Sequence, residues 1–250
     1  MIDEQVVIFD EENIIDIGGE VPTGATIVDA HGATLMPGLI DSHVHTSIDG
    51  LRHALKFGVT TELEMMGGFT KNARDLELKG IDDIADVRSA GMGVTAPGGH
   101  PDELMGGGDG IPDFVLKEME KMTEEEKAAF IVAHAQQEND EESPSFTTIE
   151  GTIKHVDEQV LHGADYIKIL IEEGTVMNCP GLPVLSNDIY KAAVDEAHKL
   201  DKIVLAHVLT AESSKKAINL GIDGLAHIFI DRPSWTHELI KAIADSGAFV

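Results

Sequence analysis

Short apolar runs alternate with longer amphipathic stretches along the chain from Leu35 onward. This alternation is typical of βα units that build a parallel sheet. The apolar runs predict about seven strands, at Leu35–His45, Val59–Met66, Gly93–Ala96, Tyr166–Ile171, Ile203–Val208, Leu225–Ile230 and Ala248–Val250. The amphipathic stretches predict helices at Ile48–Phe57, Lys71–Ala90, Ile149–His162, Asn187–Leu200, Ala211–Leu220 and Trp235–Ser246. Because a closed (β/α)₈ barrel has eight strands, we expect an α/β fold of the TIM-barrel type that is incomplete and lacks its last unit.

The first 34 residues follow a different pattern. Short apolar runs at Val6–Phe9, Asn13–Ile17 and Ile27–Asp29 are separated by glycine and proline. Such spacing predicts short strands joined by turns. We therefore divide the chain into a small β segment over residues 1–34, expected to be part of a composite β domain, and a barrel over residues 35–250.

The composition is that of a folded and strongly acidic protein. Apolar residues make up 42% of the chain, which is enough for a core and excludes wholesale disorder. The 45 acidic residues outnumber 18 lysines and arginines, so the formal net charge is −27. Such a surface repels phosphate backbones and anionic lipids, which argues against nucleic acid and membranes as partners. The stretch Lys117–Ser143 predicts a charged helix and an acidic loop in solvent. Salt adaptation and an ordinary acidic surface both fit this charge.

The sequence also carries signals about location. It has no run of eighteen uncharged apolar residues, and its first residues, MIDEQVVIFDEE, are acidic where a signal peptide is basic. Cys179 is the single cysteine, so no internal disulfide can form. We expect a cytoplasmic protein.

Two histidines end the first apolar run of the barrel, in the sequence Asp41-Ser42-His43-Val44-His45. Residues two apart on a strand point to the same side, so His43 and His45 should project together from the strand's carboxyl end. Two such imidazoles form half of a metal site. Taken alone, the pair could equally be two histidines without a ligand.

Two later strands end in the same way. His207 closes the run Ile203–Val208, and His227 follows Leu225. The carboxyl ends of the strands form the active-site face of such barrels. Four histidines from three strand ends therefore predict a metal site.

Lys168 lies within the apolar sequence Tyr166–Ile171. An unpaired buried ammonium is unfavourable, and burial lowers the pKa of a lysine. A neutral amine can add carbon dioxide and become a carbamate, an anionic oxygen donor able to bridge two metals.

Four motifs together carry a resemblance that runs from about Val6 to Val250: MPGLIDSHVH, GADYIKI, VDEAHKLDKIVLAH and AINLGIDGLAHI. They resemble the amidohydrolase superfamily of metal-dependent hydrolases, in its prolidase-like and imidazolonepropionase-like branch. The resemblance implies two divalent metal ions, with zinc as the first expectation. It assigns His43 and His45 to one metal, His207 and His227 to the other, and a carbamate on Lys168, formed from carbon dioxide, to the bridge.

One departure from the family matters for activity. The resemblance assigns the general base to an aspartate at the end of the eighth strand, and no residue here matches it by motif. Asp231 follows His227 on the same loop and is a weak substitute. We therefore expect these 250 residues alone to be incomplete as an enzyme.

Two further residues are weaker candidates. His100, in the sequence APGGHP, is either a substrate contact or an exposed loop histidine. Its glycines lack a following Gly-Lys-Ser/Thr, which argues against a phosphate-binding loop. Cys179 could be a nucleophile only beside an activating base. The remaining histidines are expected on the surface or in packing: His31, His53, His134, His155, His162, His198 and His237.

Three functions stay open at this point. The first is a binuclear amidohydrolase that cleaves a C–N bond in a dipeptide, an N-acyl amino acid or a related amide. The second is a mononuclear cyclic amidase or deaminase in which Lys168 is structural. The third is an inactive fragment with a folding or assembly role. The expected partner is a small-molecule amide, and a homo-oligomer is compatible with the sequence.

Overall fold

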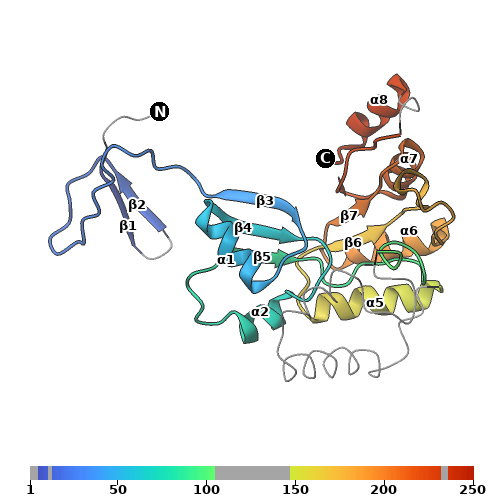
Figure 1. Cartoon of the computed structure of the whole chain (residues 1–250), viewed down its shortest axis with the longest axis horizontal. Helices are drawn as coiled ribbons and strands as arrows, with labels where there is room; N and C mark the ends of the chain where they lie inside the picture. The colour runs from blue at the N-terminus through green and yellow to red at the C-terminus, as the bar shows by residue number, and fades with distance from the viewer. Residues whose placement is uncertain (1–4, 11–12, 105–146, 232–235) are drawn as a thin grey trace. The chain divides into compact units, whose positions relative to one another are not determined.

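A computed structural model describes residues 5–10, 13–104, 147–231 and 236–250 (Figure 1). The chain divides into two compact units, Met1–Gly38 and Leu39–Val250. The first unit contains strands β1 (Val7–Asp10) and β2 (Asn13–Ile17), which pair antiparallel. Its role as part of a composite β domain stays a prediction, and the predicted acidic segment Lys117–Ser143 lies outside the described residues.

The second unit contains two parallel three-stranded sheets with the orders β3-β4-β5 and β6-β7-β8. The elements of the first sheet are β3 (Leu39–Val44), α1 (Ile48–Lys56), β4 (Val59–Glu64), α2 (Lys71–Glu77) and β5 (Asp86–Ser89). The elements around the second sheet are α5 (Ile149–Leu161), β6 (Ile167–Leu170), the 3₁₀ helix η1 (Thr175–Met177), α6 (Asn187–Lys199), β7 (Val204–His207), α7 (Ala211–Leu220), β8 (Gly224–Leu225) and α8 (His237–Ser246). Strands therefore alternate with helices, as the sequence pattern predicts.

Among the described residues, Val94 makes an isolated strand bridge to the second sheet, in addition to other contacts between the sheets such as the bond from Asp165 N to Ser89 O. Val94 pairs in parallel with Ile169, and its backbone both donates to Lys168 O at 2.8 Å and accepts from Leu170 N at 3.0 Å. At the other end, Phe249 pairs in parallel with Gly224. The strands thus follow chain order, but among the described residues they do not close into a barrel, because β3 pairs only with β4.

Five predicted elements need correction. The strand predicted at Ile27–Asp29 does not form, and the one at Ala248–Val250 is reduced to the bridge at Phe249. The helix predicted at Lys71–Ala90 ends at Glu77, and β5 occupies Asp86–Ser89 instead. Gly80 adopts a positive φ of 80° after the helix, which ends the helical path. The strand predicted at Gly93–Ala96 is reduced to the bridge at Val94, and the one at Leu225–Ile230 is confined to Gly224–Leu225.

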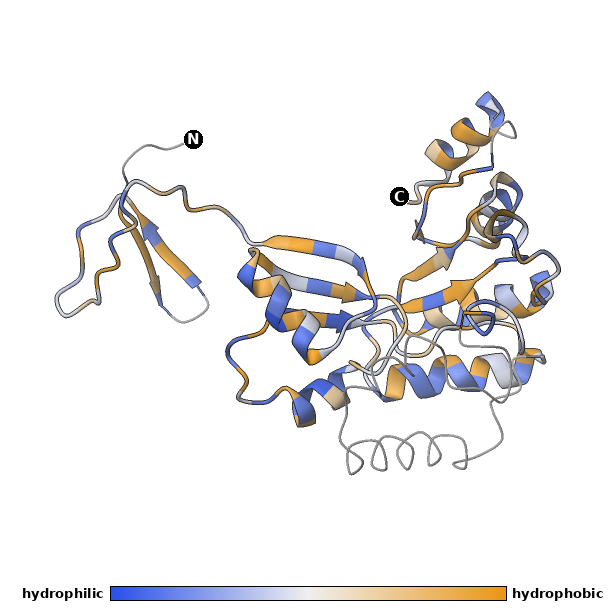
Figure 2. Ribbon diagram, in the orientation of Figure 1, coloured by the Kyte–Doolittle hydropathy of each residue, from blue (hydrophilic) through white to orange (hydrophobic). Residues whose placement is uncertain are grey.

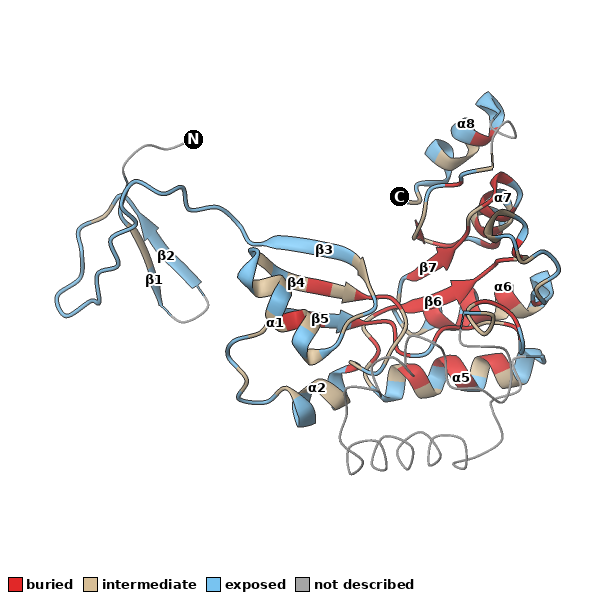
Figure 3. Ribbon diagram, in the orientation of Figure 1, coloured by how far each residue is buried: buried red, intermediate tan, exposed pale blue. Residues whose placement is uncertain are grey.

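The main core lies between the second sheet and helices α5, α6 and α7. Ile167, Ile169, Val204 and Ala206 pack there against helix residues such as Tyr190. Figure 2 shows the apolar character of β6 and β7, and Figure 3 shows that both strands are buried. Because alternate residues face opposite sides of a strand, this packing turns Lys168 and His207 to the side away from the helices.

The helices around this core begin at side-chain caps. Ser186 accepts from Ile189 N at the start of α6, and Thr210 accepts from Ser213 N at the start of α7. Such a cap stabilises a helix by about 1 kcal/mol. None of the helices in the described part of the chain has the length and apolar character that crossing a membrane requires.

Candidate metal centre

The four predicted histidines lie together beyond the carboxyl ends of the strands. The ring centroids of His43 and His227 are 4.4 Å apart, and those of His207 and His227 are 4.7 Å apart. His45 is farther out, at 5.8 Å from His43, and its side chain is 63% exposed. Strands β3, β7 and β8 therefore bring their terminal histidines to one place.

Hydrogen bonds indicate which ring nitrogen of His43 and His45 is free. His43 Nδ1 lies 3.1 Å from the carbonyl oxygen of Ala226, and His45 Nδ1 lies 3.4 Å from that of Met66. A carbonyl oxygen can only accept, so Nδ1 carries the hydrogen in both rings. Their Nε2 atoms are then left with a lone pair that can bind a metal.

His207 is enclosed on several sides. The ring of His100 stacks on it with centroids 4.3 Å apart, and His100 Nδ1 lies 2.5 Å from Glu103 Oε1. Nε2 of His207 is buried and has no hydrogen-bond partner among the described residues. Its neighbour at 3.7 Å is Oε2 of Glu172. The structure thus places His100 beside the histidine cluster, on the loop where we expected a substrate contact.

Burial keeps most of these imidazoles neutral. Burial, followed by the neighbouring charged groups, lowers the pKa of both His207 and His227 to about 3. Burial and the charge of Lys168 also lower the pKa of His43. The pKa of His45 is instead raised, chiefly by the nearby carboxylate of Glu64. Neutral imidazole is the form that binds metal.

Lys168 is 3% exposed and lies in the second sheet beside Leu205. Burial lowers the pKa of its amine to about 8, and the carboxylate of Glu64 only partly offsets this. The amine is therefore far easier to deprotonate than that of an exposed lysine.

The sequence reasoning missed two buried glutamates at this end of the sheets. Glu64, the last residue of β4, accepts from Met66 N at 3.0 Å and from Ser89 Oγ at 2.6 Å. Glu172 lies just past β6 and is 1% exposed. Glu172 stands directly after the apolar run Tyr166–Ile171, as the histidines follow theirs, whereas Glu64 lies inside the predicted run Val59–Met66.

Two weaker candidates find no support in the geometry. Asp231 Oδ1 accepts from Ala211 N at 2.8 Å and so caps the start of α7. This bond engages one of its two carboxylate oxygens in capping a helix. Cys179 lies after η1, and its backbone N–H donates to Gly174 O at 3.1 Å. Among the described residues, the thiol of Cys179 makes no hydrogen bond with a base that could activate it.

The donor set fits a divalent ion, although the side chains do not yet surround one. Among the described residues, no three imidazole, carboxylate or thiolate groups converge closely enough to hold a metal as they stand. However, two ring nitrogens bound to one zinc at about 2.1 Å are separated by about 3.4 Å, which rings in contact reach by small rotations. The neutral imidazoles of His43, His207 and His227 support this fit, because neutral imidazole can bind a metal.

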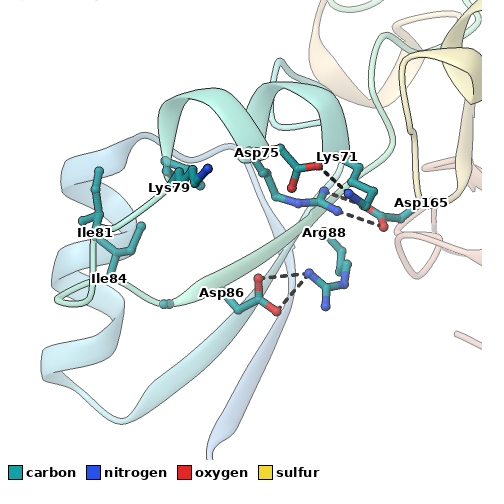
Figure 4. Close-up of a pocket in the computed structure, with 11 residues that line it drawn as sticks. Lys71, Asp75, Lys79, Ile81, Ile84, Asp86, Arg88 and Asp165 are labelled. Atoms are coloured by element: carbon teal, nitrogen blue, oxygen red, sulfur yellow. Dashed lines mark hydrogen bonds and ion pairs between the residues drawn. The ribbon is translucent and has the colours of Figure 1, made fainter. Parts of the chain in front are cut away.

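A cavity of about 870 Å³ lies elsewhere, toward the amino ends of β5 and β6 (Figure 4). Its charged residues already pair with one another: Arg74 with Asp165, Arg88 with Asp86, and Lys71 with Asp75. It is therefore separate from the histidine cluster, and we assign it no chemistry.

Comparisons with known proteins agree with this fold. No family model matches the chain. A dihydroorotase from Geobacter sulfurreducens is 37% identical over 91 residues, which cover 35% of this chain and 21% of the dihydroorotase. The crystal structure of an amidohydrolase has a TM-score of 0.70 at 22% identity, over 97% of this chain and 59% of its own. A prolidase complexed with N-methylphosphonate-L-proline has a TM-score of 0.71 at 23% identity, over 100% of this chain and 61% of its own.

These likenesses confirm the resemblance to the amidohydrolase superfamily at the level of the fold. The chain has the mixed α/β architecture with parallel sheets of the amidohydrolase and prolidase structures. It spans about three fifths of the length of these solved structures.

Proposed function

We propose that the protein is a metal-dependent hydrolase that cleaves the C–N bond of an amide, such as a dipeptide or an N-acyl amino acid. The observation that carries this proposal is the contact between the rings of His43, His207 and His227 beside the buried Lys168. The similar proteins support the reaction class, since they include an amidohydrolase, a prolidase and a dihydroorotase.

In this proposal His43 and His45 hold one divalent ion, zinc first, and His207 and His227 hold a second. Lys168, as a carbamate formed with carbon dioxide, would supply anionic oxygen ligands to these ions. When bound, two such ions lower the pKa of a shared water and polarise the carbonyl group of the substrate.

The chain's own residues orient the ligands and hold the strand ends in place. The carbonyl oxygen of Ala226 fixes the ring of His43, and Glu64 lies 3.8 Å from Nδ1 of His45. The hydroxyl of Tyr166 lies 2.8 Å from Glu64 O and 3.1 Å from Arg88 O and shares its one hydrogen between them, which connects β4 and β5 to the start of β6.

Metal content gives the direct test. We expect zinc to bind the dialysed protein at up to two ions per chain, measured by mass spectrometry of the metal. His207→Ala should remove most of the zinc, because it deletes a buried donor, and it should also abolish any hydrolysis of a dipeptide panel. His53→Ala, on the exposed face of α1, is the matched control and should bind like the wild type. Equal zinc in both variants would contradict the proposal.

A mononuclear cyclic amidase or deaminase is the second candidate. It is favoured by the outlying place of His45, since His43, His207 and His227 form the tighter group. One zinc per chain that survives Lys168→Ala would support this candidate, whereas loss of metal in that variant supports the binuclear site. Zinc binding that is absent under all conditions would leave the folding or assembly role.

A further inference from the structure

Glu172 is a buried carboxylate that the proposed function does not use. Its Oε1 accepts from Gly174 N at 2.6 Å, in the loop that follows β6. Its Oε2 is buried and has no hydrogen-bond partner among the described residues. A buried carboxylate oxygen without a partner is unfavourable, so this placement requires a reason.

Oε2 of Glu172 lies near a second buried polar atom that has no hydrogen-bond partner among the described residues. Nε2 of His207 lies 3.7 Å away and is equally buried and unpartnered within the described part of the chain. The separation is slightly too long for a hydrogen bond. The two atoms are nevertheless complementary if the hydrogen of the neutral ring is on Nε2, since one then donates and the other accepts.

That tautomer has a consequence for metal binding. With the hydrogen on Nε2, the lone pair of His207 is on Nδ1. A histidine that binds a metal almost always donates its other ring N–H to a carboxylate or a carbonyl oxygen, which fixes the tautomer and the ring orientation. His43 already shows this arrangement with the opposite nitrogen, since its Nδ1 faces Ala226 O.

Other side chains pack around His207 and the loop that carries Glu172. His100 stacks on one face of the His207 ring, with centroids 4.3 Å apart. Next to Glu172, the carboxylate of Glu173 accepts from Thr210 Oγ1 at 3.4 Å and from Ser213 Oγ at 3.0 Å. These bonds tie the loop after β6 to the start of α7, the helix that follows His207.

We propose that Glu172 is a positioning residue that accepts a hydrogen bond from Nε2 of His207 and thereby presents Nδ1 of that ring to the metal. This inference deepens the proposed function and rests on it for the metal. The contact to the ring can be tested separately.

The first experiment observes the tautomer of His207 in the ¹⁵N-labelled chain. Long-range ¹H–¹⁵N spectra of the metal-free protein, with His207→Gln used for assignment, should show the hydrogen on Nε2. Glu172→Ala should give a mixture of tautomers. Glu172→Gln keeps an acceptor oxygen of the same size and should restore the Nε2–H form. A ring that carries its hydrogen on Nδ1 in the wild type would overturn the inference.

The second experiment measures zinc affinity by calorimetry. Glu172→Ala should weaken zinc binding about 10- to 100-fold, as loss of such partners does at other metal sites, and Glu172→Gln should recover most of it. Glu212→Gln removes the same charge from the exposed first turn of α7 and should leave the affinity nearly unchanged. If Glu172→Gln weakens zinc binding as strongly as Glu172→Ala does, the hydrogen bond to His207 is not what matters and the positioning role is wrong.

The two proposals can fail separately. If zinc does not bind the wild type but the tautomer responds to Glu172 as expected, the contact stands and the proposed function falls. If zinc binds with equal affinity in the wild type and in Glu172→Ala, the proposed function stands and the positioning role falls.

Discussion

Both parallel sheets end in histidines of the same cluster, although the strands of the two sheets differ in burial. Strands β6 and β7 are buried at every position. Strand β3, in contrast, leaves Leu39 50% exposed and Ile40 64% exposed. Both sheets nevertheless end in residues of the histidine cluster. Strand order and direction therefore decide where the ligands lie, whereas packing decides how firmly each strand holds them.

The largest expected effect tests this difference in packing. Ile169→Ala removes a fully buried side chain from the core behind β6 and should lower the free energy of unfolding by about 2–5 kcal/mol. Ile40→Ala, on exposed β3, should change it by less than about 0.5 kcal/mol. Urea denaturation followed by circular dichroism measures both. Equal losses would show that β3 is covered in solution and that the contrast is wrong.

A smaller effect is expected at the ion pair that joins the two sheets. Arg74 of α2 donates to Asp165 at 2.6 Å, and the same carboxylate accepts from Ser89 N at 2.9 Å. The two side chains are 11% and 25% exposed. Arg74→Ala leaves Asp165 partly buried without its cation and should cost about 1–3 kcal/mol by the same denaturation assay.

Arg52→Ala is the control for this pair. Arg52 makes a similar bond to Asp83 on the surface, where solvent screens it, so its loss should have little effect. Similar losses in the two variants would mean that the ion pair between the sheets has no special importance.

The smallest effect should appear as a dependence of stability on pH. His155 of α5 is 3% exposed and donates from Nε2 to Met92 O at 2.9 Å. Burial lowers its pKa below the usual 6.5, so the unfolded chain takes up the proton first as the pH falls. The stability that this neutral histidine provides is complete above about pH 6.5 and is lost as the pH falls toward its lowered pKa.

Melting temperatures between about pH 7.5 and about pH 5.5 measure this loss. Because other buried histidines change stability in the same direction, the difference between the wild type and His155→Gln is the relevant quantity. That difference should shrink as the pH falls. A constant difference in melting temperature would show that protonation of His155 does not change the stability.

The sequence predicted the histidine cluster because strand ends and period-two alternation are local signals. His43, His45, His207 and His227 each end an apolar run, and parallel strands bring such ends together. Strand β5 was missed because Val87 is its single apolar residue, so its identity depends on pairing with β4. Glu172 was missed because its partner, His207, lies 35 positions further along the chain (207 − 172 = 35) and becomes a neighbour only through the pairing of β6 with β7.

The histidine cluster draws its residues from both parallel sheets, which gives the site a mechanical role. His43 and His45 belong to the first sheet or lie just after it, and Lys168, His207 and His227 belong to the second sheet or lie just after it. An ion bound by residues from both groups would link the two sheets. Its binding free energy would oppose separation of the two sheets. Metal binding would therefore also stabilise the contact between the sheets.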